Sequence, residues 1–238
     1  MEKDNLERIP TGIPGFDEMI EGGIEKSSTV LVIGGCGSGK STLCMQYIIN
    51  GCRIGQPGVY VSMEESPDKI KKHMRRFGWD LEKYEKNGLL RIIRIGPKDA
   101  LQVIKEDYGQ IANAITDLKA ERMVIDSISS LESLLETDHD IKENAVRLVE
   151  WLNKKNCTTL IISESEETIG EYTRHGIMEF VVDGVIVMYN MQKGNVRENA
   201  LEVLKMRGTK HLKMIVPFKI DKGIEVFPHE QVFGECER

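Results

Sequence analysis

A glycine-rich segment that ends in lysine and serine carries the strongest chemical signal in the sequence. Residues 34–41 read Gly-Gly-Cys-Gly-Ser-Gly-Lys-Ser, which matches the spacing G-x-x-x-x-G-K-S of a phosphate-binding loop, or P-loop. The glycines let the backbone approach a bulky anion, and the N–H groups of the loop and the following helix point at it. The lysine can reach the β- and γ-phosphates, and the serine hydroxyl can ligate Mg²⁺. We therefore expect a nucleoside triphosphate here, with contacts from Gly35, Cys36, Gly37, Ser38, Gly39, Lys40, Ser41 and Thr42 and with Lys40 among the catalytic residues.

An aspartate at the end of an apolar run is the candidate second anchor for the metal. Asp126 closes the run Arg-Met-Val-Ile-Asp of residues 122–126. Mg²⁺ on a triphosphate needs such an acid, usually bound through a water molecule. We expect Asp126 to serve in this way beside Ser41. A helix-capping aspartate in an Asp-Ser pair is the alternative.

Two adjacent glutamates follow the first strand-like segment after the P-loop. Residues 59–63 are largely apolar, and Glu64 and Glu65 come directly after them. A carboxylate beside the γ-phosphate can orient and deprotonate the attacking water. Because side chains alternate along a strand, we expect one glutamate to face the phosphate and the other to turn away. We assign Glu64 as the base and Glu65 as a supporting ligand of metal or water. The reverse order and two solvated turn carboxylates are the alternatives.

Two cations stand two residues apart near the end of the chain. Lys205 and Arg207 belong to the segment Lys-Met-Arg-Gly-Thr-Lys-His, and on a strand they would share a face. Two cations so placed repel each other and gain from an anion. A triphosphate on a neighbouring subunit would serve, as with an arginine finger supplied in trans. A basic solvent face on an edge strand is the alternative.

Strands that alternate with helices must position these residues. Strand-like segments occupy 29–33, 59–63, 89–95, 122–126 and 158–163, and helical segments occupy 42–51, 67–76, about 100–118 and 144–152. This alternation predicts an α/β fold with a mostly parallel central sheet flanked by helices. The carboxyl ends of such strands bind ligands, and the P-loop, the glutamates and Asp126 all fall at such ends.

After residue 163 the pattern changes. Residues 163–175 are polar and predict a mobile loop, and 184–189, 200–206, 214–220 and 224–227 are short strand-like segments with no helix between them. That pattern predicts antiparallel C-terminal strands that extend the edge of the sheet. No composition change marks a boundary, so we expect residues 1–238 to form a single domain.

Composition bounds the class of protein. The chain has 238 residues, of which 40% are hydrophobic and 29% charged, and a net charge of −6, which gives no global electrostatic case for nucleic acid. No apolar run approaches the ~20 residues that span a bilayer, and the N-terminus is too polar for a signal peptide. The five cysteines form no C-x-x-C pair. We expect reduced thiols, a cytoplasmic location and no membrane partner.

Taken together, these motifs resemble the KaiC domain of the RecA/RadA superfamily of ATPases. The resemblance covers nearly all of the chain. It rests on separate signatures in the order of the family: 11–17 with 21–23, the P-loop, 64–67, 124–127, 183–186, 205–211 and 217–218.

The resemblance implies a RecA-like core, ATP as the nucleotide, and a homo-oligomeric ring, often a hexamer, with ATP at the subunit interfaces. In that family the paired glutamates are catalytic, which maps to Glu64 and Glu65. The acid after the apolar strand coordinates Mg²⁺ through water, which maps to Asp126. The K-x-R motif reaches the γ-phosphate of the neighbouring subunit, which maps to Lys205 and Arg207.

One departure from the family separates this chain from the circadian clock KaiC proteins. Those carry two such domains in tandem, and the second has a Ser-Thr pair that is phosphorylated shortly before the D-x-V/I strand. Here residues 177–182 read Ile-Met-Glu-Phe-Val-Val, without a hydroxyl. The chain therefore looks like a single-domain KaiC-like ATPase of the kind common in archaea, and a clock-type autokinase at this position is not expected.

Three functions compete on the sequence. The first is a slow, Mg²⁺-dependent, ring-forming ATPase that acts as a nucleotide-driven regulatory switch for a protein partner. The second is a recombinase-like ATPase on single-stranded DNA, motivated by the basic segment 69–76. The polar loop counts against it, since single-strand binders prefer cationic grooves with stacking aromatic residues. The third is a nucleotide-binding interaction protein with negligible turnover.

Overall fold

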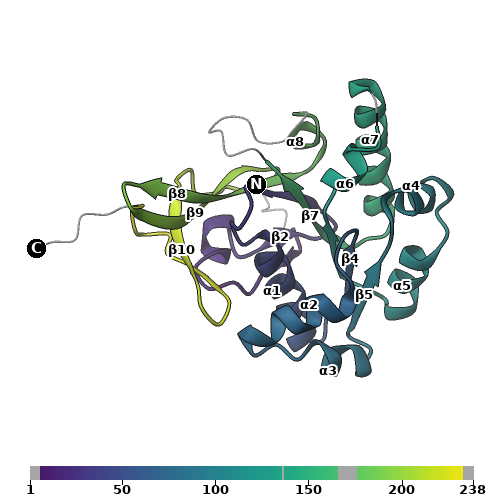
Figure 1. The fold of residues 1–238 in the computed structure, drawn as a ribbon, viewed down its shortest axis with the longest axis horizontal. Helices are drawn as coiled ribbons and strands as arrows, with labels where there is room; N and C mark the ends of the chain where they lie inside the picture. Colours follow the sequence, from purple (N-terminus) through teal and green to yellow (C-terminus); the bar gives the residue numbers. More distant parts are fainter. Residues whose placement is uncertain (1–5, 136, 166–175, 233–238) are drawn as a thin grey trace, which may run out of the picture.

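The computed structural model describes residues 6–135, 137–165 and 176–232. Its central feature is a nine-stranded sheet with the strand order β11-β10-β9-β8-β3-β7-β6-β4-β5 (Figure 1). A separate two-stranded ribbon, β1 (Arg8–Ile9) with β2 (Ile24–Glu25), lies in the N-terminal segment beside the 3₁₀ turn η1 (Asp17–Ile20). The predicted α/β fold with a mostly parallel sheet is confirmed.

Six neighbouring strands run parallel. They are β8 (Gly184–Lys193), β3 (Thr29–Gly34), β7 (Thr158–Glu164), β6 (Arg122–Asp126), β4 (Gly58–Ser62) and β5 (Leu90–Arg94). The inner strands β3, β4 and β6 are continuous apolar runs because both faces of the sheet are covered.

Two groups of helices cover the two faces (Figure 1). One face packs on α1 (Lys40–Arg53), α2 (Pro67–Met74), the 3₁₀ turn η2 (Arg75–Phe77) and α3 (Leu81–Lys86). The other packs on α4 (Pro97–Glu106), α5 (Gln110–Leu118), α6 (Ser129–Glu132), α7 (Asp138–Lys154) and α8 (Met178–Val181). Alternate side chains of the strands enter the two apolar clusters, so the sheet divides the core into two layers.

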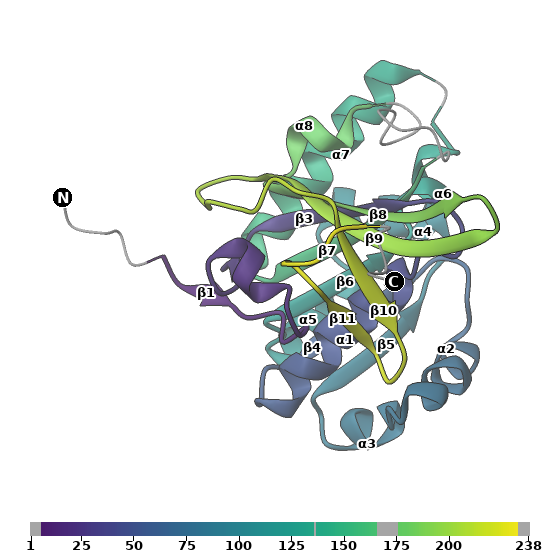
Figure 2. The ribbon, with the colours of Figure 1, turned by 90° about the vertical axis from the view of Figure 1, so that its left-hand side faces the viewer.

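The C-terminal strands extend the sheet in antiparallel fashion, as expected. β9 (Val196–Met206), β10 (Val216–Ile220) and β11 (Ile224–Val226) follow one another, each antiparallel to its neighbour (Figure 2). The first of the four late strands, β8, differs from the rest: it lies parallel to β3 and antiparallel to β9. It joins the parallel part of the sheet because the chain crosses over before it, through α8.

The helical segment expected at about 100–118 is wrong as one continuous helix. It is broken into α4 and α5 at Asp107, which takes a left-handed conformation at φ 52°, and at Gly109 at φ 125°. Asp107 accepts hydrogen bonds from Trp151 Nε1 at 2.6 Å and Lys155 Nζ at 2.5 Å, both from the region of α7. These contacts between distant segments stabilise the break, and periodicity within the segment does not reveal them.

No helix among the described residues is long and apolar enough to cross a bilayer. Of the cysteines that the structure describes, Cys36, Cys44, Cys52 and Cys157 are free thiols, and of these four only Cys36 is exposed.

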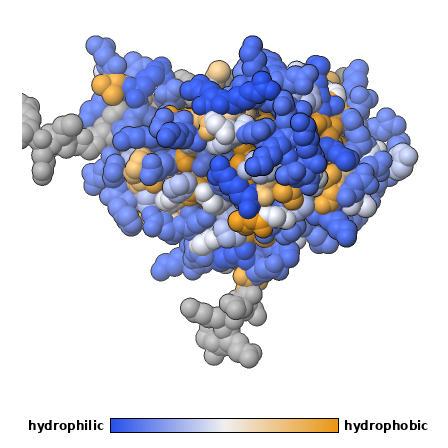
Figure 3. Space-filling view, turned by 90° about the horizontal axis from the view of Figure 1, so that it is seen from below, coloured by the Kyte–Doolittle hydropathy of each residue, from blue (hydrophilic) through white to orange (hydrophobic). Residues whose placement is uncertain are grey.

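The view from below, the side of α2 and α3, is mostly hydrophilic with small separate apolar patches (Figure 3). Most of the loop expected at 163–175 lies outside the described residues. Its expected start is wrong, because Ser163 and Glu164 belong to β7 and only Ser165 follows the strand within the described residues.

Candidate active site at the carboxyl edge of the sheet

The carboxyl ends of three parallel strands bring the predicted site residues together. The P-loop follows β3, the two glutamates follow β4, and Asp126 ends β6. Ser62 lies opposite Asp126 in the register of β4 and β6, so the residues after β4 stand beside the end of β6. The sheet thus gathers at one edge groups that are far apart in the sequence.

The P-loop is shaped by glycines that no other residue could replace without strain. Gly37 and Gly39 have φ of 77° and 93°, in the left-handed region. A Cβ on Gly34 would lie 2.3 Å from the carbonyl oxygen of Met188 and 2.6 Å from Ser38 Oγ. The loop is therefore pressed against β8 and then enters α1 directly, with the N–H groups of its first turn at the loop.

Lys40 curls back over this loop. Its ammonium donates to the carbonyl oxygens of Gly34 at 2.8 Å and Gly35 at 2.9 Å. Burial lowers the pKa of Lys40, and the carboxylates of Glu164 and Asp126 oppose that shift. The side chain is thus a buried cation held at the place where the P-loop motif puts phosphate.

Asp126 is held by two hydroxyl groups. Ser41 Oγ donates to its Oδ2 at 2.9 Å, and Tyr60 Oη donates to the same oxygen at 2.5 Å. Burial raises the pKa of Asp126, while the hydrogen bonds from Tyr60 and Ser41 and the charge of Lys40 lower it. The serine and the aspartate that the sequence assigned to one metal are therefore in direct contact, across 85 residues of chain.

The two glutamates turn to different elements. Glu64 is exposed and accepts a hydrogen bond from Ser130 Oγ of α6 at 2.8 Å. Glu65 pairs with Lys69 at 2.6 Å and lies 3.6 Å from His73, both on α2. The charge of Glu64 also acts on Asp126 and raises its pKa. Glu64 thus lies close enough to Asp126 for its charge to act on it, whereas Glu65 is engaged with the helix that follows it.

Lys205 and Arg207 share a face, as predicted. They lie near the amino ends of the parallel strands β8 and β3, whereas the P-loop follows the carboxyl end of β3. Lys205 Nζ donates to the carbonyl oxygens of Glu179 at 3.0 Å and Val182 at 2.6 Å, and Arg207 donates to that of Phe180 at 3.0 Å. Both therefore bind the carbonyl groups in and just after α8. Burial lowers the pKa of Lys205, and the charge of Arg207 adds to that shift.

The register gives the separation of the two sites. Met206 lies opposite Gly184, and Gly184 lies opposite Val30 at the start of β3. The P-loop begins at the other end of β3. Lys205 lies opposite Val185, and Val185 lies opposite Leu31. With a rise of about 3.3 Å per residue, the backbone of Lys205 is about 10 Å from Gly34 along the strand direction, and that of Arg207 is farther away.

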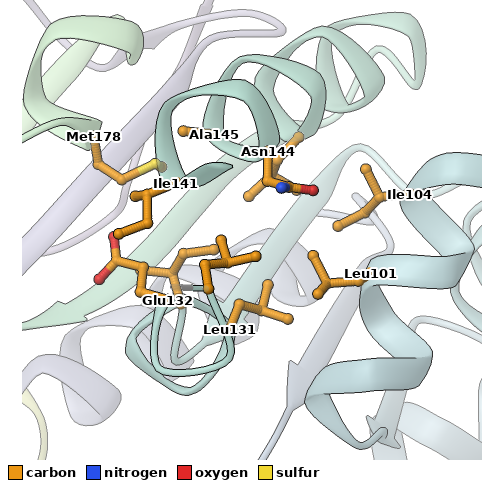
Figure 4. Close-up of a pocket in the computed structure, with 11 residues that line it drawn as sticks. Leu101, Ile104, Leu131, Glu132, Ile141, Asn144, Ala145 and Met178 are labelled. Atoms are coloured by element: carbon orange, nitrogen blue, oxygen red, sulfur yellow. The ribbon is translucent and has the colours of Figure 1, made fainter. Parts of the chain in front are cut away.

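An apolar cavity between α4, α6 and α7 is not the nucleotide site. It encloses about 20 Å³ and is lined mainly by aliphatic side chains, with Leu101 and Ile104 facing Leu131 across it (Figure 4). Sites for small molecules usually enclose a few hundred Å³. The cavity lies behind α6, on which Ser130 holds Glu64.

Sequence reasoning missed several residues that this site uses. Tyr60 and Ser130 hold the predicted carboxylates, and Glu164 acts electrostatically on Lys40. Strand alternation places Tyr60 on the same face of β4 as the helix α1, since Val59 and Val61 enter the other cluster. Strand alternation thus predicts the face of β4 on which Tyr60 lies, but not the residue that its hydroxyl contacts.

A P-loop on the central strand, with acids at the ends of neighbouring parallel strands, defines a RecA-like P-loop nucleotide-binding protein. Comparison with known proteins agrees. The family described as "ATPase: KaiC" matches residues 9–231, so the chain belongs to the KaiC family of ATPases.

Particular relatives support the same assignment. The chain is 33% identical over 236 residues to circadian clock protein KaiC3 of Synechocystis, covering 95% of this chain and 47% of that protein. It is 36% identical over 233 residues to the circadian clock oscillator protein KaiC of Nostoc, covering 94% and 45%. The chain thus spans about half the length of these curated relatives.

A solved structure of a KaiC-like protein from the hyperthermophilic archaeon Pyrococcus horikoshii is also similar. It matches with a TM-score of 0.83 and 38% identity, over 94% of this chain and all of that one. The RecA-like fold expected from the sequence is therefore confirmed by a structure of related sequence.

Proposed function

We propose that the chain is a slow, Mg²⁺-dependent ATPase whose site lies at the carboxyl edge of the sheet. The observation that carries the proposal is the contact of Ser41 with Asp126 at 2.9 Å, directly beside the P-loop and Lys40. Three hydroxyl oxygens near this edge, on Ser38, Ser127 and Ser163, are buried without a hydrogen-bond partner among the described residues. Buried unsatisfied hydroxyls are costly, and a polar ligand or ordered water would satisfy them.

The donor set fits a magnesium ion. Ser41 and Asp126 offer hard oxygen atoms, and Mg²⁺ uses few protein ligands because it keeps several waters. Ser41 would hold the ion directly and Asp126 would hold it through water. When bound, the ion neutralises charge that develops on the phosphate oxygens.

The protein's own groups would then act as follows. The P-loop N–H groups and Lys40 bind and orient the phosphates, with Lys40 exchanging its carbonyl partners for phosphate oxygens. Glu64 orients the attacking water and accepts its proton, in a position set by Ser130. Glu65 supports the site from the start of α2.

Lys205 and Arg207 would act on a neighbouring subunit. They lie at the far edge of the sheet from the P-loop of their own chain, so they cannot serve its phosphate without a large rearrangement. A head-to-tail homo-oligomer, with residues 1–238 as one domain per subunit and six subunits as the expected number, would place them at the next site. ATP at such interfaces would let the nucleotide state set the shape of the ring, as a regulatory switch requires.

The single-stranded DNA alternative loses its main support. The basic segment that motivated it is largely neutralised, because Lys69 pairs with Glu65, Lys71 with Glu85 and Arg75 with Glu82. Counter-ion release by free cations supplies most DNA affinity. Steady-state turnover measured with and without single-stranded DNA at two salt concentrations discriminates: stimulation that salt abolishes would favour the DNA function.

Glutamine substitutions test the chemistry. We expect Glu64→Gln to lower kcat by about 10²–10³-fold, since a general base contributes of that order, while nucleotide affinity stays near that of the wild type. Glu65→Gln should lower kcat less, because Glu65 is engaged with α2. Mg²⁺-dependent phosphate release and nucleotide binding are measured for both variants.

The matched pair makes the result interpretable, since both variants change one carboxylate to an amide at adjacent positions. Normal hydrolysis by the Glu64→Gln/Glu65→Gln double variant would overturn the assigned chemistry. A larger loss for Glu65→Gln would reverse the two roles. No turnover by the wild type, despite ATP binding, would support the interaction protein instead.

A further inference from the structure

The hydroxyl of Tyr60 is a structural feature for which the P-loop motif has no role. Tyr60 lies on β4 and is 1% exposed, with its ring in the apolar cluster under α1. Its Oη donates to Asp126 Oδ2 at 2.5 Å. A phenylalanine would fill the same space, so packing alone does not require the oxygen.

The geometry around Asp126 shows what that oxygen does. Tyr60 and Ser41 converge on one carboxylate oxygen, Oδ2, from two different elements. Among the described residues no hydrogen bond reaches the other oxygen, Oδ1, and that atom is not sealed from solvent. The carboxylate is thereby fixed in one orientation with one oxygen left to accept from a water.

Ser41 cannot hold this orientation alone. In the proposed function the serine oxygen also ligates the metal, so its position follows the ion. Tyr60 comes from β4, an inner strand that is hydrogen-bonded on both sides to parallel strands of the sheet. A donor on such an element holds the carboxylate while the ion and nucleotide enter and leave.

We propose that Tyr60 is a positioning residue for divalent-cation binding, acting through Asp126. The inference rests on the proposed function and adds a specific residue to it. Outer-shell partners of direct metal ligands typically contribute 10–100-fold to metal affinity, because they orient the ligand. Tyr60 acts on an aspartate that would reach the ion through a water, so we expect an effect at the lower end of that range. Loss of the Tyr60 hydroxyl should therefore weaken the cation and spare the nucleotide itself.

The test is Tyr60→Phe, with Tyr47→Phe as the matched control. Tyr47 is also fully buried, and its hydroxyl donates to the carbonyl oxygen of Thr158 at 2.9 Å, away from Asp126. Both variants lose one oxygen and one buried hydrogen bond. Binding of Mn²⁺, as a probe for Mg²⁺, is measured by electron paramagnetic resonance on the full chain with ADP. Nucleotide affinity in EDTA and thermal unfolding are measured alongside.

We expect Tyr60→Phe to weaken Mn²⁺ binding about tenfold, with nucleotide affinity in EDTA within about twofold, and Tyr47→Phe to change neither. Equal Mn²⁺ affinity in wild type and Tyr60→Phe would overturn the inference. So would an equal loss in Tyr47→Phe, or a Tyr60→Phe variant that does not fold, since either shows a structural role. Failure of the wild type to bind Mn²⁺ with nucleotide would instead overturn the proposed function.

Discussion

At the scale of single residues, buried polar groups do most of the specific positioning. Arg122 is fully buried, and its guanidinium donates to the carbonyl oxygens of Tyr47 at 2.8 Å and Pro10 at 2.8 Å and to Gln56 Oε1. Its Cζ atom lies over the Tyr47 ring, 4.6 Å from the ring centre. Among the described residues no carboxylate lies within ion-pair distance of it, so carbonyl and amide oxygens accept its hydrogen bonds. It links the N-terminal segment to α1, the helix that begins at the P-loop.

Gly51 of α1 must stay small because of that guanidinium. A Cβ there would lie 2.4 Å from both Cδ and Nε of Arg122, and the hydrogen bonds of Arg122 prevent it from moving aside. In an ordinary helix Gly→Ala stabilises by about 0.5–1 kcal/mol. We expect Gly51→Ala instead to lower the free energy of unfolding by about 1–3 kcal/mol, as overpacking does, measured by urea denaturation.

A double-mutant cycle isolates the cause. In an Arg122→Ala background both Cδ and Nε are absent, so Gly51→Ala should become neutral or stabilising. If Gly51→Ala destabilises equally in both backgrounds, the contact with Arg122 is not the reason for the glycine.

At the scale of elements, the break between α4 and α5 depends on one aspartate. Asp107 ends α4 in a left-handed conformation and accepts from both Lys155 and Trp151. The hydrogen bond from Lys155, and then that from Trp151, lowers the pKa of Asp107. Because the folded-state pKa lies below the unfolded value, this contribution is present above about pH 3.8 and is lost as the pH falls through the folded pKa.

Asp107→Ala should therefore destabilise the fold more at pH 7 than in acid. The carboxylate is more than half exposed, so solvent screening limits its value, and we expect a loss of about 1 kcal/mol at pH 7. The loss should shrink as the pH falls below about 3.8 and through the lowered pKa of Asp107, because the carboxylate of the folded wild type is then protonated. Asp107→Asn is the control, since it keeps an acceptor and tolerates the left-handed conformation. A pH-independent difference would contradict the assignment.

At the scale of the whole molecule, the two ends of the parallel sheet carry different parts of the proposed site. The phosphate groups would bind at the carboxyl edge, while Lys205 and Arg207 lie at the amino edge and bind carbonyl groups around α8. Within one subunit, the P-loop and the pair Lys205 and Arg207 lie too far apart to contact the same nucleotide. Head-to-tail assembly would join them at each interface.

Mixing two inactive variants tests that assembly. Lys40→Ala removes the phosphate ligand and Arg207→Ala removes the finger, so we expect each alone to have little turnover. Mixed one to one and reassembled, they should recover about one quarter of the wild-type rate, because random neighbours then complete that share of sites. Turnover is measured after mixing at several protein concentrations.

The control for mixing is Arg207→Ala combined with the double variant Lys40→Ala/Arg207→Ala. That mixture has no intact Arg207 and should stay inactive. No recovery in the first mixture, although oligomers form by light scattering, would show that Arg207 does not act in trans.

The sequence by itself determined the fold class, the P-loop and the strand ends where carboxylates stand. These depend on local patterns: a strand, a glycine turn and a helix in fixed spacing, and apolar runs that alternate with helices. The side chain of Ser66 caps α2 by accepting from the backbone N–H of Lys69, and such a cap also depends on the local sequence.

Tertiary structure alone decided which distant groups meet. It placed Tyr60 and Ser41 on Asp126, separated Glu64 from Glu65 by giving them partners on different helices, and put Lys205 and Arg207 at the edge away from the P-loop. It also broke the helix at Asp107 by a contact with α7. Apart from the pairing of Glu65 with Lys69 four residues away, these outcomes depend on packing and hydrogen bonds between segments dozens of residues apart, which local propensity does not encode.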